Sequence, residues 1–464
     1  MSDNRPEASS PSLQTNATNA GPAGAVSRRA LLLSSAVAAV AGIAGAASLT
    51  GAASLTSAAG LVLPGSAGAA TGRGAGRLKV GVIGCGGRGT GAAVNILEAS
   101  PDVQVWAIAD LFKDRVDGSL SEMQKFDAER VNVPPERRFA GFDSYKALLA
   151  TDVDIVILAT APGFRPVHFA AAIDAGKHVF MEKPVAVDPA GVRRVINAAK
   201  KAAEKKLSVV AGTQRRHEVA YNEAYKRIQE GELGKVVHCS VYWNQGGLWM
   251  HNRKPEWSDM EWQIRNWLYF AWLSGDHITE QHVHNLDVAH WFMGAVPTKV
   301  TALGGRQVRT SPEYGHVFDH FGCDFEYEDG RHVASYCRQI DGCSSRVEEV
   351  ICCSDGVATL RQGGTAEFKG KSKWKWAGEQ VNPYVQEHKD LLASINGKGG
   401  YLNHGERIAH STLMAIMGRM SAYTGKTITW QQAMESTLDL MPENCALGNL
   451  PMPEVAVPGR SPVM

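Results

Sequence analysis

A glycine-rich segment early in the chain constrains the fold more than any other feature. The apolar run Leu78–Ile83 leads directly into Gly84, Gly86 and Gly89, in the order G-x-G-x-x-G. A buried parallel strand followed by this spacing is typical of a dinucleotide-binding βαβ unit. There Gly84 permits the tight turn and Gly86 lets the backbone approach a pyrophosphate. Gly89 lets the next helix, expected over 90–98, pack on the strand with its N-terminus toward the phosphates.

An acidic residue after the next apolar run supports the same unit. Residues 103–109 read as a second strand, and Asp110 follows it, close to the offset of about 20 residues at which a carboxylate binds ribose hydroxyls. A carboxylate there repels a 2′-phosphate, so we expect NAD rather than NADP. The alternative is a glycine turn in some other α/β protein, which would require strand, glycines, helix and aspartate to be in register by chance.

Composition excludes several classes of function. The chain has 464 residues, of which 44% are hydrophobic and 20% charged, enough for two domains with real cores. Its formal net charge is +1, and no basic run predicts binding to nucleic acid. The eight cysteines form no C-x-x-C motif and no paired zinc spacing, so we expect free, buried thiols.

The first 70 residues read as a leader rather than as part of a globular domain. Residues 1–26 are rich in Ser, Asn, Pro, Gly and Ala and are expected to be disordered. Ser27-Arg28-Arg29 precedes a long, weakly apolar stretch, as in a bacterial twin-arginine (Tat) export signal, and small residues at 66–70 offer a cleavage site. We therefore expect a periplasmic or secreted protein, exported already folded with its nucleotide. An uncleaved membrane anchor is the alternative.

Beyond Asp110, strands and helices alternate as far as residue 212. The longest helix is expected from 189 to about 206. The expected buried strands lie at 154–160, His178–Met181 and 208–212. This alternation predicts a doubly wound parallel sheet over residues 77–212.

Two motifs follow strands of this sheet at its carboxyl edge, where open α/β sheets bind ligands. Thr160-Ala161-Pro162 ends one strand in a rigid turn, and His168 opens the following helix. Glu182-Lys183-Pro184 directly follows the strand His178–Met181. A lysine fixed between Glu and Pro at this edge is placed for chemistry, although an ordinary strand-end lysine on the surface is the simpler interpretation.

Together these motifs resemble those of the Gfo/Idh/MocA oxidoreductases. The resemblance covers residues 77 to about 430 and is most specific where Ala175-Gly176-Lys177-His178-Val179 leads into Glu182-Lys183-Pro184. It implies a Rossmann domain over 77–212. It also implies a C-terminal α/β domain over 213–440 with an open, mostly antiparallel sheet, one face of which commonly packs against a partner subunit. A homo-oligomer is therefore expected, with residues 441–464 as a Pro-rich tail.

The resemblance also implies roles for individual residues. Lys183 is expected between nicotinamide and substrate, where it assists proton transfer. Arg88 lies inside the glycine loop and is expected to add a charge-assisted bond to the pyrophosphate. The expected cofactor-binding residues are Gly84, Gly86, Arg88, Gly89, Asp110, Thr160, Pro162, His168, Glu182 and Lys183.

Residues 274–294 form the second informative stretch. Helical spacing predicts one helix that ends at Gly294, on which Glu280, His284 and Asp287 share a face at i, i+4 and i+7. A histidine with a pKa near ~6.5 accepts a hydroxyl proton at neutral pH, and a carboxylate orients it and stabilises its charged form. Lys183, His284, Glu280 and Asp287 are therefore the predicted catalytic residues.

This stretch departs from the family pattern Gly-Gly-x-x-x-x-Asp-x-Gly-x-His-x-x-Asp. Glu280 stands where Asp is usual and His282 where Gly is usual, whereas His284 and Asp287 match. The departures affect substrate geometry more than reaction type. A metal site built from the histidines within 277–290 is an alternative, but His282 and His284 point to different helix faces, and we expect no metal. A purely structural role for His284 is the other alternative.

Six of the eleven tryptophans lie between residues 243 and 272. Stacking on sugar rings is the functional interpretation, and ordinary core or interface packing is the simpler one for most of them.

These features lead to three hypotheses about function. The first is an exported NAD-dependent oxidoreductase that acts on a sugar, glycoside or cyclic polyol hydroxyl. The second is an NAD-dependent glycosidase that oxidises the sugar transiently, eliminates the aglycone and reduces the product back. The third is a nucleotide-holding binding protein without catalysis.

Overall fold

The computed structural model describes residues 76–462, and its first half is built on a six-stranded sheet. The strand order is β3-β2-β1-β4-β5-β6, and every neighbouring pair is parallel. The strands are β1 (Leu78–Ile83), β2 (Val103–Asp110), β3 (Arg138–Ala140), β4 (Ile155–Leu158), β5 (His178–Met181) and β6 (Val209–Ala211). Because the order reverses between β1 and β4, their carboxyl ends open a crevice of the kind that binds nucleotides. The predicted doubly wound sheet is confirmed.

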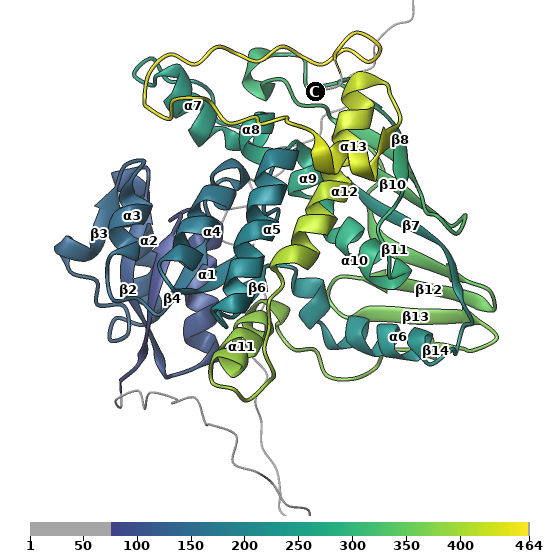
Figure 1. The fold of residues 1–464 in the computed structure, drawn as a ribbon, viewed down its shortest axis with the longest axis horizontal. Helices are drawn as coiled ribbons and strands as arrows, with labels where there is room; N and C mark the ends of the chain where they lie inside the picture. Colours follow the sequence, from purple (N-terminus) through teal and green to yellow (C-terminus); the bar gives the residue numbers. More distant parts are fainter. Residues whose placement is uncertain (1–75, 463–464) are drawn as a thin grey trace, which may run out of the picture. The chain divides into compact units, whose positions relative to one another are not determined.

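Helices cover both faces of this sheet because its central strands are apolar on both sides. All four residues of β4 are buried, as expected for a central parallel strand. The helices of this half are α1 (Gly87–Ala99), α2 (Lys113–Phe126), α3 (Ser144–Leu149), α4 (Arg165–Asp174) and α5 (Pro189–Glu204). Two helices from the far end of the chain complete the covering: α11 (Pro383–Ile395) packs on α1 and α12 (Gly405–Thr424) packs on α5 (Figure 1).

Two predicted helix starts are wrong by a few residues. Helix α1 begins at Gly87 rather than at 90, because Gly86 with extended backbone caps it. Helix α4 begins at Arg165 rather than at His168, because Pro166 fits the first turn of a helix, where no amide hydrogen is needed.

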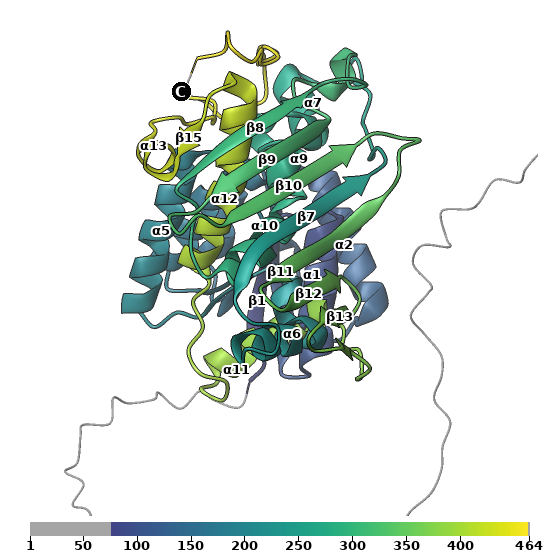
Figure 2. The same ribbon diagram turned by 90° about the vertical axis from the view of Figure 1, so that its right-hand side faces the viewer.

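The second half contains a nine-stranded, mostly antiparallel sheet, as predicted. Its strand order is β14-β13-β12-β11-β7-β10-β9-β8-β15, and β7 pairs in parallel with β10 only. The strands are β7 (Val236–Gln245), β8 (Lys299–Gly305), β9 (His320–Glu326), β10 (His332–Gln339), β11 (Arg346–Cys353), β12 (Gly356–Arg361), β13 (Thr365–Gly370), β14 (Trp374–Lys375) and β15 (Ile428–Thr429). Figure 2 looks onto the outer face of this sheet, with α10 and α12 behind it. Leu303 of β8 and Tyr336 of β10 are exposed and alternate with buried residues along their strands.

The remaining helices of this half are shorter, and α10, together with α12, packs on the inner face of the sheet. These shorter helices are α6 (Val219–Gln229), α7 (Asp259–Arg265), α8 (Ala271–Ser274), α9 (His277–Glu280), α10 (Val283–Met293) and α13 (Trp430–Glu435). Beyond α13 the chain runs over α7, where the amide of Met260 donates to the carbonyl of Gly448 at 3.1 Å (Figure 1).

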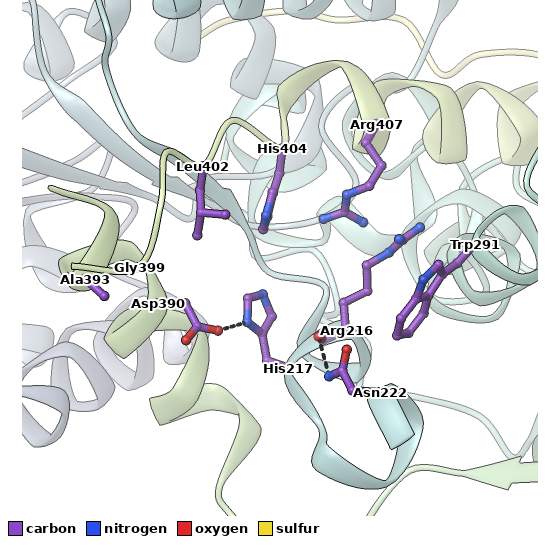
Figure 3. A pocket seen from close by; sticks show the side chains of 10 residues that line it. All are labelled: Arg216, His217, Asn222, Trp291, Asp390, Ala393, Gly399, Leu402, His404 and Arg407. Carbon is purple, nitrogen blue, oxygen red and sulfur yellow. Dashed lines mark hydrogen bonds and ion pairs between the residues drawn. The ribbon is translucent and has the colours of Figure 1, made fainter. Parts of the chain in front are cut away.

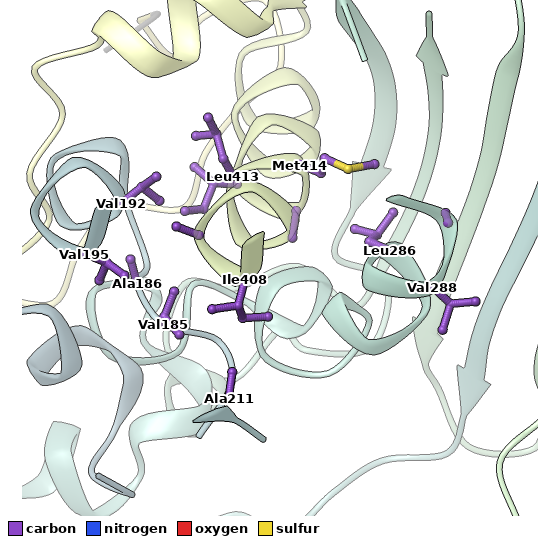
Figure 4. Packing of buried hydrophobic residues seen from close by; sticks show 14 of the residues in the cluster. Val185, Ala186, Val192, Val195, Ala211, Leu286, Val288, Ile408, Leu413 and Met414 are labelled. Atoms are coloured by element: carbon purple, nitrogen blue, oxygen red, sulfur yellow. The ribbon is translucent and has the colours of Figure 1, made fainter. Parts of the chain in front are cut away.

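Helix α12 is the central element of the core. Figure 4 shows Ile408, Leu413 and Met414 on this helix between Val192 of α5 and Leu286 of α10. Because α12 contacts both the nucleotide-binding half and the second sheet through fully buried side chains, it holds the two halves together.

The predictions for residues 1–70 lie outside the described residues. Within 76–462, none of the helices combines the length and the apolar character that crossing a bilayer requires.

Leu413 provides a test of the part played by α12. We expect Leu413→Ala to lower the free energy of unfolding by about 2–5 kcal/mol, because truncation leaves a cavity in the core. Leu447→Ala is the matched control, since Leu447 lies in the C-terminal segment and is 53% exposed. Its effect should stay within about 0.5 kcal/mol. Thermal scans compare the melting temperatures of both variants with that of the wild type. Equal shifts in melting temperature would contradict this role for α12.

Candidate cofactor and substrate cleft

A continuous cleft lies at the carboxyl ends of β1, β4 and β5. It consists of two adjoining cavities of about 500 Å³ each, which share Gly86, Arg88 and Thr160. One cavity reaches Asp110 and the other reaches Lys183 and His284. The cleft therefore has the extended form needed for a dinucleotide at one end and a substrate at the other.

The glycine loop has the geometry that the sequence predicts. Gly84 has a positive φ of +99°, and an added Cβ would lie 2.4 Å from the amide nitrogen of Thr160. At Gly89 an added Cβ would lie 1.8 Å from the carbonyl oxygen of Gly84, so the glycine allows α1 to touch β1. Gly86 caps α1, and an added Cβ there would meet nothing within 4 Å. The first turn of α1 therefore presents its free amides to open space, as a pyrophosphate requires.

Asp110 lies at the far end of the cleft, on the last residue of β2. Its carboxylate accepts hydrogen bonds from the amides of Cys85 at 2.7 Å and Phe112 at 3.0 Å. Burial raises its pKa, although both amides and the positive charge of Arg115 act in the opposite direction. The two bonds fix the carboxylate beside the glycine loop, where a ribose would lie.

Arg88 makes contacts that differ from the predicted bond to a pyrophosphate. Its Nε donates to Glu182, and its Nη2 donates to Glu387 of α11 at 3.1 Å. The pKa of Glu387 is well above its usual value, because burial and the negative charge of Glu182 outweigh the opposing effect of the positive charge of Arg88. The guanidinium lines the cleft, but the contacts it makes hold the start of α1 to α11.

The turn after β4 is held by a buried arginine that the sequence did not single out. Arg165 donates to the carbonyl oxygens of Thr160 and Pro184, and it therefore ties together the turns that follow β4 and β5. Thr160, Pro162 and Arg165 all line the cleft.

His168 does not line the cleft, contrary to its predicted contact with the cofactor. Its Nδ1 lies 3.2 Å from the Oγ1 of Thr160, and its ring packs against Tyr145 and Phe164. Burial is the main cause that lowers its pKa to about 3, so the ring is neutral. The helix begins three residues before His168, which places this side chain behind the turn, where it positions Thr160.

The predicted single helix over 274–294 is wrong, because it breaks between α9 and α10. The amide of His282 donates to the carbonyl of His277, five residues back, at 3.1 Å, which interrupts the regular pattern. The carbonyl of Glu280 accepts instead from Nζ of Lys183 at 2.8 Å, and Oε1 of Glu280 accepts from the same ammonium at 3.1 Å. Lys183 and Glu280 thus meet in the cleft, where the side chain of each is close to nine-tenths buried.

His284 lines the cleft near Lys183, as predicted. Its ring stacks on Trp243 with centroids 5.7 Å apart. Burial lowers the pKa of His284 well below 6.5, and the positive charges of Lys183 and Arg215 lower it further. The imidazole is therefore neutral at pH 7 and able to accept a proton. Its Nδ1 is buried without a hydrogen-bond partner, which leaves Nε2 as the nitrogen available to a substrate.

Asp287 does not line the cleft, contrary to its predicted catalytic role. Its carboxylate accepts from Arg216 Nε at 2.7 Å, Arg407 Nη1 at 3.1 Å and Ser411 Oγ at 2.8 Å. These partners hold its pKa far below the usual range despite burial. Asp287 lies one turn beyond His284 on the same helix, where its neighbours are Arg216 and residues of α12, so it fastens α10 to α12 while His284 lines the cleft.

Several cleft residues come from segments that sequence reasoning did not connect to the site. Gln214 follows β6, Gln281 lies in the helix break, Gln362 lies in the turn between β12 and β13, and Tyr384 lies in α11. Tyr384 lies under the guanidinium of Arg88, 5.0 Å from its carbon to the ring centroid. The sequence positions of these residues carry no local signal, and Tyr384 reaches the cleft because α11 packs on α1.

The cluster of tryptophans divides between the cleft and the core. Trp243, Trp249 and Trp267 line the cleft, whereas Trp262 and Trp272 are buried in a core cluster. The histidines of the same region do not gather around one point: Nε2 of His282 binds Ser335 Oγ of β10 at 2.8 Å. Over residues 76–462, no three His, Cys, Asp or Glu side chains are grouped so as to hold a metal ion.

Comparison with protein families agrees with this geometry. Residues 78–210 match the model described as "Oxidoreductase family, NAD-binding Rossmann fold", and residues 221–359 match "GFO/IDH/MocA C-terminal domain". Together the two matches cover more than half of the chain, in the expected order. The chain belongs to the Gfo/Idh/MocA family of NAD-binding oxidoreductases.

Curated relatives match only in part. A 2,7-anhydro-N-acetylneuraminate hydratase of Escherichia coli is 26% identical over 201 residues, which are 43% of this chain and 50% of the relative. An inositol 2-dehydrogenase of Rhodococcus erythropolis is 27% identical over 53% of this chain and 63% of the relative. The chain spans about half the length of the first curated relatives it matches.

Solved structures share the fold over most of the chain. A levoglucosan dehydrogenase in complex with NADH and levoglucosan aligns with a TM-score of 0.61 and 16% identity, over 76% of this chain and 99% of the other. An aldose-aldose oxidoreductase from Caulobacter crescentus aligns with a TM-score of 0.59 and 19% identity, over 76% of this chain and 99% of the other. At these identities the likeness establishes the fold alone.

The residues at the glycine loop fit NAD. The free amides of α1, the open space at Gly86 and the carboxylate of Asp110 match the pyrophosphate and the ribose of this cofactor in turn.

Gly89→Ala tests the contact between α1 and β1. The added methyl group must push the helix away from Gly84, which we expect to lower the melting temperature and to weaken NADH binding by about tenfold or more, since overpacking costs about 1–3 kcal/mol. Gly91→Ala is the matched control in the same helix, because its Cβ would meet Arg88 at an ordinary 3.6 Å. NADH titrations followed by fluorescence compare the two variants. Equal affinities would show that the close contact at Gly89 does not position the loop.

Proposed function

We propose that the protein is an NAD-dependent dehydrogenase that acts on a hydroxyl group of a sugar, glycoside or cyclic polyol. The meeting of Lys183, Glu280 and His284 at the substrate end of the cleft carries the proposal. The named relatives support it, since they include inositol 2-dehydrogenases, and the levoglucosan dehydrogenase shares the fold.

Different residues of the cleft carry out different steps in the oxidation of an alcohol. When bound, NAD supplies a nicotinamide ring that takes up hydride from the carbinol carbon. Nε2 of neutral His284 takes the hydroxyl proton. The ammonium of Lys183, held in place by Glu280, stabilises the negative charge that develops on the substrate oxygen. Trp267 and the amides of Gln214 and Gln281 offer apolar and hydrogen-bonding contacts to a neutral polyol.

A substrate screen tests the proposal directly. Purified full-length protein is mixed with NAD and a panel of monosaccharides, inositols and glycosides, and the absorbance of reduced nicotinamide is followed. We expect at least one substrate to give turnover. His284→Gln should lower kcat/KM by about 10²-fold or more. His332→Gln, at an exposed histidine of β10, is the matched control. The proposal fails if NADH neither binds nor raises the melting temperature.

The low pKa of His284 predicts the pH dependence of this activity. A base whose pKa lies well below 6.5 is protonated only at lower pH, so kcat/KM should stay constant as the pH falls through about 6.5 and should decline only well below it. A decline centred at pH 7 or above would show that another group is the base.

A glycosidase that oxidises its substrate transiently is the second candidate. Two of the relatives are named 2,7-anhydro-N-acetylneuraminate hydratases, and hydration involves no net oxidation. The same pair, Lys183 and His284, would then move protons in both directions. Release of p-nitrophenol from aryl glycosides without added NAD would select this candidate, whereas turnover that consumes NAD selects the dehydrogenase.

The twin-arginine segment supports export to the periplasm or beyond, with an uncleaved membrane anchor as the alternative. An exported enzyme has no access to a cytoplasmic pool of NAD and should hold its cofactor through washing, which requires a dissociation constant of roughly nanomolar order, about −12 kcal/mol. Denaturing washed protein and assaying the supernatant measures this. Less than about a tenth of a nucleotide per chain would argue against a resident cofactor.

A homo-oligomer through the outer face of the nine-stranded sheet is part of the same proposal. Leu303 and Tyr336 are exposed on this face, and two such side chains on a flat sheet suit a symmetric contact between copies.

A further inference from the structure

A further cavity shares no lining residue with the cleft. It has a volume of about 360 Å³ (Figure 3). Arg216, His217, Asn222, Trp291, Asp390, Ala393, Gly399, Leu402, His404 and Arg407 line it. We propose that this cavity binds a small oxyanion, of the phosphate or carboxylate type, through the two arginines and His404.

The two arginines are held rigidly, with N–H groups left over. Arg216 donates from Nε and Nη2 to Asp287, and Arg407 donates from Nη1 to Asp287 and from Nη2 to Thr213 at 3.2 Å. Among the described residues, neither Nη1 of Arg216 nor Nε of Arg407 has a hydrogen-bond partner. The side chain of Arg216 is 14% exposed and that of Arg407 is 22% exposed, so an ion in the cavity can reach both guanidinium groups.

The charges of this cluster favour an anion. The carboxylate of Asp287 is shared by two guanidiniums, which leaves one positive charge in excess among the three groups. The other carboxylate of the cavity, Asp390, binds Nδ1 of His217, and Figure 3 shows it on the side of that ring away from the arginines. Guanidinium groups with preset positions recognise planar and tetrahedral oxyanions, since their donors match two oxygens at once.

The two histidines differ in what they offer an anion. His217 is buried, and its Nδ1 is hydrogen-bonded to the carboxylate of Asp390, so its Nε2, which has no hydrogen-bond partner, donates to an anion only when the ring is doubly protonated. In His404, Nδ1 accepts from the amide of Ala211 at 3.5 Å, and burial and Arg407 hold the pKa well below 6.5, so the ring is neutral with its proton on Nε2. The rings lie 5.9 Å apart, centroid to centroid, and Figure 3 shows both directed into the space beside the arginines.

Trp291 limits the size and kind of ligand. One side of its ring system faces the guanidinium of Arg216 at 4.8 Å, and Tyr225 stacks on it with centroids 4.8 Å apart. Because these neighbours cover the indole, no face of it is free to stack on a nucleobase or a sugar ring. A small ion therefore fits the cavity better than a nucleotide.

Isothermal titration with inorganic phosphate tests the site. The full-length protein is kept saturated with NADH, so that the glycine loop is occupied, and the ionic strength is held constant with sodium chloride. We expect saturable binding of one phosphate per chain. Sulfate and acetate, titrated in the same way, show whether tetrahedral or planar oxyanions fit better, and binding of any of the three supports the site.

Three variants locate the binding. His404→Leu and Arg407→Met should each weaken phosphate binding by about tenfold or more, because each removes a donor from the cavity. Arg460→Met removes an exposed charge from the C-terminal segment and should leave the affinity unchanged. If Arg407→Met does not fold, His404→Leu decides, since it leaves both ion pairs of Asp287 intact. No saturable heat with any oxyanion, or equal affinity in wild type and His404→Leu, would overturn the proposal.

Discussion

The contact between the ammonium of Lys183 and Glu280 is the interaction on which the arrangement of the site depends. It joins the end of β5 to the end of α9, and thus the nucleotide-binding half to the half that carries His284. A carbonyl and a carboxylate of one residue hold the ammonium in a largely buried position, where opposite charges attract more strongly than in water. The helix break after Glu280 makes this possible, because a continuous helix would engage that carbonyl itself.

Two further buried charge clusters surround this contact and hold the supporting elements. Arg88 binds Glu182 and Glu387 and so ties α1 to α11, and Asp287 binds Arg216 and Arg407 and so ties α10 to α12. Each cluster is assembled from distant parts of the chain. Removing one member leaves a buried charge without its partner, which costs far more than the pair contributes, so the clusters define one arrangement of these helices.

Local patterns were sufficient for most of the nucleotide-binding half. The glycine spacing, the acidic end of β2 and the lysine after β5 each reflect a requirement of backbone or position that involves residues close in sequence. For this reason Gly84, Gly89 and Asp110 have the geometry predicted for them. Helix starts were less well predicted, as at α4, because Pro166 permits a first turn before the residue at which the apolar pattern begins.

The sequence by itself determined the class of fold, the glycine loop and the presence of a lysine and a histidine suited to proton transfer. Only the tertiary structure decided which polar groups share the cleft. Asp287 matches the family pattern yet faces Arg216 and Arg407, His168 lies behind Thr160, and Tyr384 reaches the site from α11. The reason is physical. The partner of a buried charge depends on how distant segments pack: Asp287 binds Arg216, 71 residues before it, and Arg407, 120 residues after it, and no local periodicity encodes such pairs.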